Sequence, residues 1–162
     1  MNRARTTWLI VAIALVCAGC GVRPSGVIPG DPAPIGPVNG ATLMFVHDGA
    51  LVPSLRTTSD QPSVVEAVEL LIGGPDTDEQ AVGLTSKVPA NAGPVNLTGD
   101  TSGLTLDIAI DPNTLPPLAV DQLTCTAVGA LVDQGTALRS EPGFFIAGAG
   151  NRIGPVTCPE GS

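Results

Sequence analysis

Four cysteines and one histidine are the residues of this 162-residue chain best suited to covalent, redox or metal chemistry. The cysteines are Cys17, Cys20, Cys125 and Cys158, and the histidine is His47. A catalytic site needs a positioned base, nucleophile or metal. The chain has one histidine, and it stands in a turn sequence, so few catalytic mechanisms are open to it. The chain also lacks the GxSxG, phosphate-loop and HExxH motifs. We therefore expect a protein that is not an enzyme and has no cofactor.

Two groups of acidic and amide side chains are further candidates for metal ligands. They are Asp76, Asp78 and Glu79, and Asp107, Asp111 and Asn113. The first group follows a helix-ending Gly-Gly-Pro and lacks the spacing of a calcium loop, so we expect it to cap the next helical turn. The second stands at a strand end where Asp-Pro-Asn favours a turn, with a metal role as the alternative.

The first 20 residues have the layout of a secretory signal. Arg3 and Arg5 form a basic start, residues 8–16 are apolar, and small residues precede Cys20. Residues 8–19 would cover about 18 Å as a helix, against roughly 30 Å for the hydrocarbon core of a membrane. This segment is therefore too short for a permanent transmembrane helix.

The tetrapeptide from Cys17 to Cys20, Cys-Ala-Gly-Cys, resembles the lipobox of bacterial lipoproteins. The resemblance implies that residues 1–19 are removed as a signal peptide and that the thiol of Cys20 receives diacylglycerol. Cys17 stands where the family usually has leucine. Acyl chains on Cys20 would hold the protein at the outer face of the cell membrane. The alternative is a signal peptide cut elsewhere, with Cys20 left as a free thiol.

The cysteines beyond Cys20 fit this assignment. With Cys17 removed and Cys20 acylated, Cys125 and Cys158 remain, and two cysteines in an oxidising compartment predict one disulfide. A buried free pair and a metal site are the alternatives. The metal site is disfavoured because His47 is far away in sequence and no CxxC spacing occurs.

Composition and charge limit the kinds of partner that the protein can bind. Residues 21–40 hold five prolines and five glycines, which predicts that residues 20–40 form a flexible linker, or alternatively a proline-rich ligand. The formal net charge is -8, so phosphate backbones and anionic lipid head groups are repelled and nucleic acid is not an expected partner. Only Phe45, Phe144 and Phe145 are aromatic after residue 20, which disfavours sugar stacking.

Residues 41–162 have the pattern of one folded domain that begins with a hairpin. Apolar runs at 41–46 and 50–56 flank an Asp-Gly turn, and Pro53 makes the second run an edge or bulged strand. Ser63 and Glu66 form a capping box ahead of a helix that the glycines and proline at 73–75 end.

The rest of the domain alternates helical and extended patterns. A helical turn is expected at 77–82, strands at 95–97 and 104–110, a second helix at 118–132, and a final hairpin from 143–147 and 153–158. The fold class is therefore α+β. We expect one small, mostly antiparallel sheet with two main helices on one face, and a disulfide that fastens the last strand to the second helix.

The order of these elements resembles the GerM-type (GerMN) domain. Residues 43–46, 70–75, 83–89, 104–110 and 122–127 carry the resemblance, which covers about residues 41–135. It implies a non-enzymatic lipoprotein of the cell envelope, with another envelope protein, such as a sensor kinase, as its partner. A lipoprotein that binds a small ligand or an envelope polymer is the alternative, and the oligomeric state is left open.

Overall fold

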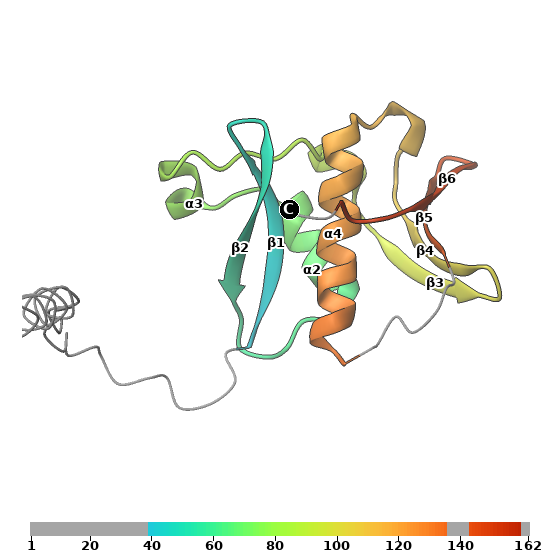
Figure 1. Ribbon diagram of the computed structural model, residues 1–162, viewed down its shortest axis with the longest axis horizontal. Coiled ribbons are helices and arrows are strands. Elements are labelled where there is room, and N and C mark those ends of the chain that lie inside the picture. The colour runs from blue at the N-terminus through green and yellow to red at the C-terminus, as the bar shows by residue number, and fades with distance from the viewer. Residues whose placement is uncertain (1–38, 136–142, 160–162) are drawn as a thin grey trace, which may run out of the picture. The chain divides into compact units, whose positions relative to one another are not determined.

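A computed structural model describes residues 39–135 and 143–159 of the chain (Figure 1). The expected signal peptide, the lipid site at Cys20 and nearly all of the expected linker lie outside these residues. The elements in chain order are β1 (Gly40–His47), β2 (Ala50–Thr57), α2 (Val64–Ile72), α3 (Thr77–Ala81), β3 (Asn96–Asp100), β4 (Gly103–Asp107), α4 (Pro117–Asp133), β5 (Gly143–Gly148) and β6 (Asn151–Val156). Short 3-10 helices lie at Ala90–Ala92 and Pro112–Thr114.

The strands form two sheets, and the α+β fold class is confirmed. β1 and β2 make an antiparallel pair, and the second sheet has the order β3-β4-β5-β6. Within it β4 and β5 run parallel, because α4 lies between them in the chain and returns it to the end from which β4 started. The expected single sheet is therefore divided in two, although most pairings are antiparallel as predicted.

The β1–β2 hairpin follows from its turn residues. Asp48 and Gly49 both have positive φ, at 50° and 82°, which matches the right-handed twist of a two-residue hairpin turn. Pro53 lies opposite Met44, whose amide points away from β2, so the missing N–H of Pro53 costs no ladder bond. In the described residues β2 pairs with β1 alone, which confirms the prediction of an edge strand.

Helix α2 begins and ends where the sequence predicts. The Ser63 hydroxyl accepts a hydrogen bond from the Glu66 amide, and the Glu66 carboxylate accepts one from the Ser63 amide at 2.7 Å. Beyond the helix, Gly74 adopts a φ of 80° that a residue with a Cβ rarely takes. The capping box and the Gly-Gly-Pro stop are both confirmed.

Helix α4 packs more extensively than an amphipathic surface helix. Figure 1 shows α4 and α2 side by side between the β1–β2 hairpin and the four-stranded sheet, and α4 contacts both α2 and β1. One core joins Phe45 of β1, Leu71 of α2, Leu123 of α4 and Ile146 of β5. Because neighbours cover several sides of the helix, its polar residues Gln122, Thr124 and Thr126 are buried with its apolar ones, and its buried surface is wider than one apolar stripe.

Side chains of α4 replace a neighbouring strand at the free edge of β1. The Gln122 amide donates to the Met44 carbonyl at 2.7 Å, and its oxygen accepts from the Lys87 amide at the same distance. Val46 exchanges two backbone hydrogen bonds with Thr85. These bonds satisfy an edge that would otherwise be open to another strand, which explains why the second sheet does not continue from β1.

The second sheet differs from prediction at one strand end. β4 ends at Asp107, whereas the alternating pattern predicted a strand to residue 110. The Ile108 amide still donates to Ala147 of β5, but the Ala109 amide donates to the carbonyl of Ala92 instead. The chain therefore leaves the sheet at Ala109, and the final two residues of the pattern pack outside the ladder.

Cys125 and Cys158 form a disulfide, as predicted. Cys125 lies in α4, and Cys158 follows the last strand by two residues. The two Cα atoms are 4.8 Å apart across a separation of 33 residues. The bond rules out the free pair and the metal site as readings of these two cysteines, and it ties the end of the chain to the central helix.

Candidate functional site

The residues that the sequence analysis singled out do not assemble into one site. His47 is exposed at the end of β1, with its Nδ1 3.4 Å from a carboxylate oxygen of the adjacent Asp48. Cys125 of α4 and Cys158, which follows β6, are joined to each other. Cys20 lies outside the described residues.

Both acidic groups take part in capping. The Asp76 carboxylate accepts hydrogen bonds from the amides of Asp78 and Glu79 at the start of α3, and Asp111 accepts one from the Asn113 amide at the second 3-10 helix. The capping expected of the first group is therefore confirmed. Across residues 39–135 and 143–159, no three His, Cys, Asp or Glu side chains form a group that could hold a metal ion.

A groove of about 640 Å³ lies between the end of β2, the segment 58–62, helix α2 and the turn at 73–76. Arg56 contributes to its wall, and we call it the Arg56 groove. Its volume falls within the range of about 300–1,000 Å³ that small-molecule pockets occupy. Four acidic side chains line it, namely Asp60, Glu66, Glu69 and Asp76.

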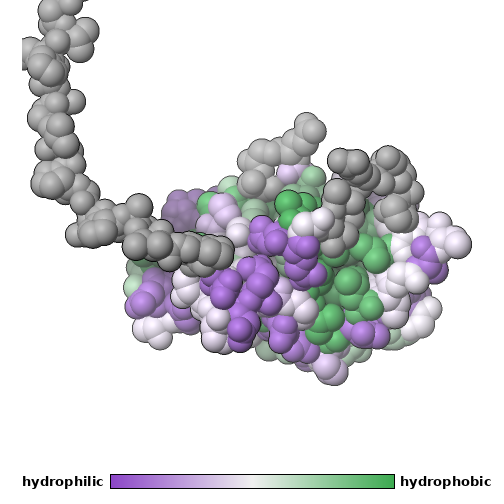
Figure 2. Space-filling model, turned by 90° about the horizontal axis from the view of Figure 1, so that it is seen from below, coloured by the Kyte–Doolittle hydropathy of each residue, from purple (hydrophilic) through white to green (hydrophobic). Residues whose placement is uncertain are grey.

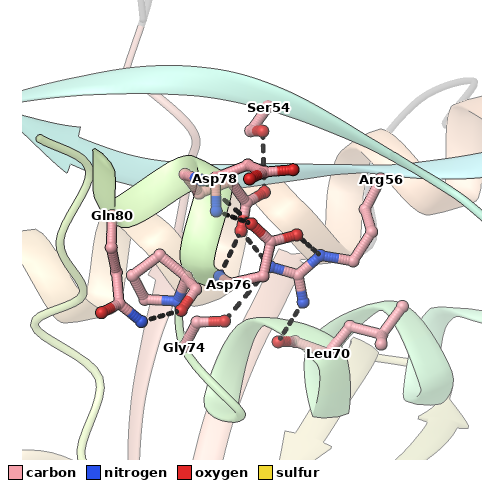
Figure 3. A network of polar contacts seen from close by, with 9 residues as sticks. Ser54, Arg56, Leu70, Gly74, Asp76, Asp78 and Gln80 are labelled. Carbon is pink, nitrogen blue, oxygen red and sulfur yellow. Dashed lines mark hydrogen bonds and ion pairs between the residues drawn. The ribbon is translucent and has the colours of Figure 1, made fainter. Parts of the chain in front are cut away.

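Arg56 joins three elements at the wall of this groove (Figure 3). Its guanidinium donates to the carbonyl of Leu70 in α2 at 3.4 Å and to the carbonyl of Gly74 beyond α2 at 3.2 Å. It also forms an ion pair with Glu79 of α3. Its Nε lies 3.8 Å from a carboxylate oxygen of Asp76. β2, α2 and α3 are thus held together by one side chain.

Glu79 completes this network from the other side. Its carboxylate accepts hydrogen bonds from the Ser54 hydroxyl at 2.8 Å and from the Asp76 amide at 2.7 Å. The Glu79 side chain is 10% exposed and that of Arg56 is 19% exposed. A pair this shielded is costly to break, because removing one partner leaves a charge with little access to water. Both charges are therefore committed to holding the groove wall in place.

One carboxyl group of the groove lining, that of Glu66, takes part in a helix cap that shifts its pKa. A hydrogen bond from the Ser63 amide, with a second from the Ser63 side chain, lowers the pKa of Glu66 below its ordinary value of 4.5. Four carboxylates face one guanidinium in the lining, and Glu79 already pairs with that guanidinium. The groove therefore carries an excess of negative charge.

The sequence did not single out Arg56, Gln122 or Thr126. In the network around Arg56, Asp76 and Glu79 did have a local signal, because they stand three residues apart in the spacing of a capping box. The partners of Arg56 come 14 to 23 residues later in the chain, and those of Gln122 on β1 are 78 residues away. No local pattern in the sequence predicts contacts between residues this far apart in the chain.

Comparison of the chain with protein-family models, with curated proteins and with solved structures found no match in any of the three. Within the described ranges, none of the helices is both long enough and apolar enough to cross a membrane.

Proposed function

We propose that this chain is a lipoprotein of the cell envelope, anchored at the outer face of the cell membrane through Cys20, whose α+β domain acts as a protein-interaction or regulatory module. The observation that carries the proposal is the division of the four cysteines. Cys17 and Cys20 stand in a lipobox-like tetrapeptide, and Cys125 and Cys158 are joined to each other.

The disulfide supports an extracytoplasmic location for the domain. Structural disulfides persist in oxidising environments such as the extracytoplasmic space and are rare in the cytosol. The bond here joins α4 to the end of the chain within a small domain, where a covalent link adds substantially to stability. Export through a signal peptide at residues 1–19 would deliver the domain to such an environment.

The lipid anchor supports a role at the membrane surface. The two acyl chains of a diacylglycerol group provide two hydrophobic anchors, which suffice for stable attachment where one does not. Residues 21–40, acting as a flexible coil, would give an average reach of about 25 Å from Cys20. A folded domain on such a tether stays close to membrane proteins without being inserted itself.

The arrangement of the charged side chains around the Arg56 groove supports a binding role. Arg56 and Glu79 hold β2, α2 and α3 together, and the groove beside them is lined by four acidic side chains. Figure 2 shows the lower face of the molecule, where hydrophilic surface lies directly beside a hydrophobic area. Val132, at the last turn of α4, is 60% exposed. Adjacent polar and apolar surface of this kind is typical of protein-binding faces.

The domain type and the partner belong to the same proposal. The resemblance of residues 41–135 to GerM-type domains favours an envelope protein as the partner, for example the extracytoplasmic part of a sensor kinase. A second candidate, a lipoprotein that captures a small ligand, is favoured by the 640 Å³ volume of the Arg56 groove.

A deletion strain with an envelope-stress reporter tests the proposal. We expect the deletion to change reporter output, the intact gene to restore it, and a Cys20→Ala gene to fail because the domain is no longer held at the membrane. An unchanged reporter in the deletion strain would contradict the regulatory function. Native mass spectrometry that found a small molecule bound to the purified chain would favour ligand capture.

A further inference from the structure

We infer that the Arg56 groove is a docking site for a cationic peptide segment, rich in arginine or lysine, of a partner protein. The inference deepens the proposed function and rests on it for the location of that partner in the cell envelope. The binding chemistry itself depends on the groove alone.

The groove carries more negative than positive charge. Four carboxylates line it, against the single guanidinium of Arg56 in the lining, which pairs with Glu79 and lies 3.8 Å from Asp76. Two of the four carboxylates, those of Glu66 and Asp76, are fixed by the helix caps they form. The other two, of Asp60 and Glu69, belong to exposed residues at the rim. These two are placed to meet a positive charge arriving from solvent, where complementary charge speeds and orients docking.

The lining of the groove is mixed rather than purely acidic. Leu70 and the prolines Pro62 and Pro75 contribute apolar surface to the same lining. Arginine and lysine have the matching character, because each carries an aliphatic stem below its charged head. Such a side chain buries its stem against the apolar lining and leaves the head among the carboxylates. A small inorganic cation would make no use of the apolar surface.

Hydrogen bonds within the domain set the shape of the groove before any ligand binds. Arg56 bonds to the carbonyls of Leu70 and Gly74, so β2 and the end of α2 are fixed on two sides. The Gln61 side chain donates to the carbonyl of Gly40, which holds the segment 58–62 against the start of β1. Preformed walls lower the ordering cost of binding a flexible peptide.

The position of the groove suits a partner near the membrane. The Asn39 side chain donates to the carbonyl of Ser59 at 3.0 Å, and the Thr58 amide donates to the carbonyl of Asn39 at 3.1 Å. Thr58 and Ser59 both line the groove. The groove is therefore at the point where the linker enters the domain. A basic segment next to a transmembrane helix of the partner would lie within the reach of the tether.

The test measures binding of a labelled tetra-arginine peptide to the purified full chain by fluorescence anisotropy. The variant Asp60→Asn/Glu69→Gln removes two rim charges, keeps the side-chain shapes and leaves both helix caps intact. Its matched control, Asp121→Asn/Asp133→Asn, removes two charges from α4, outside the groove lining. We expect the rim variant to bind about tenfold more weakly than the wild type and the control within about twofold. Circular dichroism checks that both variants are folded.

Three results would overturn the inference. The first is no binding of tetra-arginine by the wild type. The second is an equal loss in the rim variant and the control, which would indicate attraction to net charge alone. The third is equally tight binding of tetra-citrulline, the uncharged analogue. The assay uses protein in solution and does not depend on acylation of Cys20, so a negative result leaves the anchoring proposal standing. Loss of anchoring, equally, leaves peptide binding unchanged.

Discussion

The hydroxyl of Thr126 in α4 accepts a hydrogen bond from the backbone amide of Met44 in β1, at 3.0 Å and in the interior of the domain. Two residues earlier in α4, the Thr124 hydroxyl is equally buried but has no hydrogen-bond partner in the described part of the chain. The same side chain thus occurs twice in one helix, once satisfied and once not.

Replacing each threonine by valine should have opposite effects on stability. Thr126→Val leaves the Met44 amide without its acceptor and should lower the free energy of unfolding by about 1 to 3 kcal/mol. Thr124→Val removes an unpaired hydroxyl from the interior and should leave stability unchanged or raise it by about 1 kcal/mol. Urea denaturation measures both. Equal destabilisation by the two changes would contradict the hydrogen-bond assignment.

The ion pair of Arg56 with Glu79 should be strongly coupled. Arg56→Met leaves the Glu79 carboxylate nearly buried without its partner, which should cost about 3 kcal/mol or more. Adding Glu79→Leu removes that stranded charge, so the double variant should be more stable than Arg56→Met alone. A double-mutant cycle by chemical denaturation measures the coupling. A cost below about 1 kcal/mol for Arg56→Met would show that the pair behaves like an exposed surface pair.

Loss of the disulfide should weaken the domain substantially. The bond between Cys125 and Cys158 spans 33 residues, for which the chain-entropy model gives roughly 3 to 4 kcal/mol. The variant Cys125→Ala/Cys158→Ala should unfold at a correspondingly lower urea concentration. The wild type treated with a reductant should come close to it, while the variant itself should not respond to reductant. A wild type whose midpoint is unaffected by complete reduction would rule out this contribution.

The cap of α2 should make stability depend on pH. The folded-state pKa of Glu66 is lowered, chiefly by the hydrogen bond from the Ser63 amide. Its contribution to stability is therefore present above the ordinary pKa of 4.5 and is lost as the pH falls through the lower folded-state pKa. Melting temperatures from about pH 6 to about pH 3 should fall more steeply for the wild type than for Glu66→Gln. Identical slopes for the two proteins would contradict the prediction.

Local patterns in the sequence predicted most of the elements. The Asp-Gly turn, the Ser63 capping box and the Gly-Gly-Pro stop each act within a few residues, and each was confirmed. The disulfide could be predicted because only two cysteines remain after Cys20. The division into two sheets could not, because it depends on Gln122 and Thr126 bonding to Met44 across about 80 residues. A strand, a long helix and a second strand in succession did offer a hint of the parallel β4–β5 pair.

Most of the candidate site could not be predicted from local patterns in the sequence. Asp60 and Glu69 had no local feature in the sequence, and Arg56 had none to distinguish it from the other five arginines. Its role arises from the backbone carbonyls of Leu70 and Gly74, which any residue type supplies. A groove between a strand end and a helix is a property of the packed chain rather than of a motif.

The intact mass and N-terminal sequence of the mature protein, recovered from the membrane fraction of its native cells, test the central claim most directly. The account predicts a chain that begins at Cys20 and carries the mass of a diacylglycerol group on that residue, with Cys125 and Cys158 oxidised. A membrane-bound chain that retains residues 1–19, or one in which the Cys20 thiol is free, would contradict it.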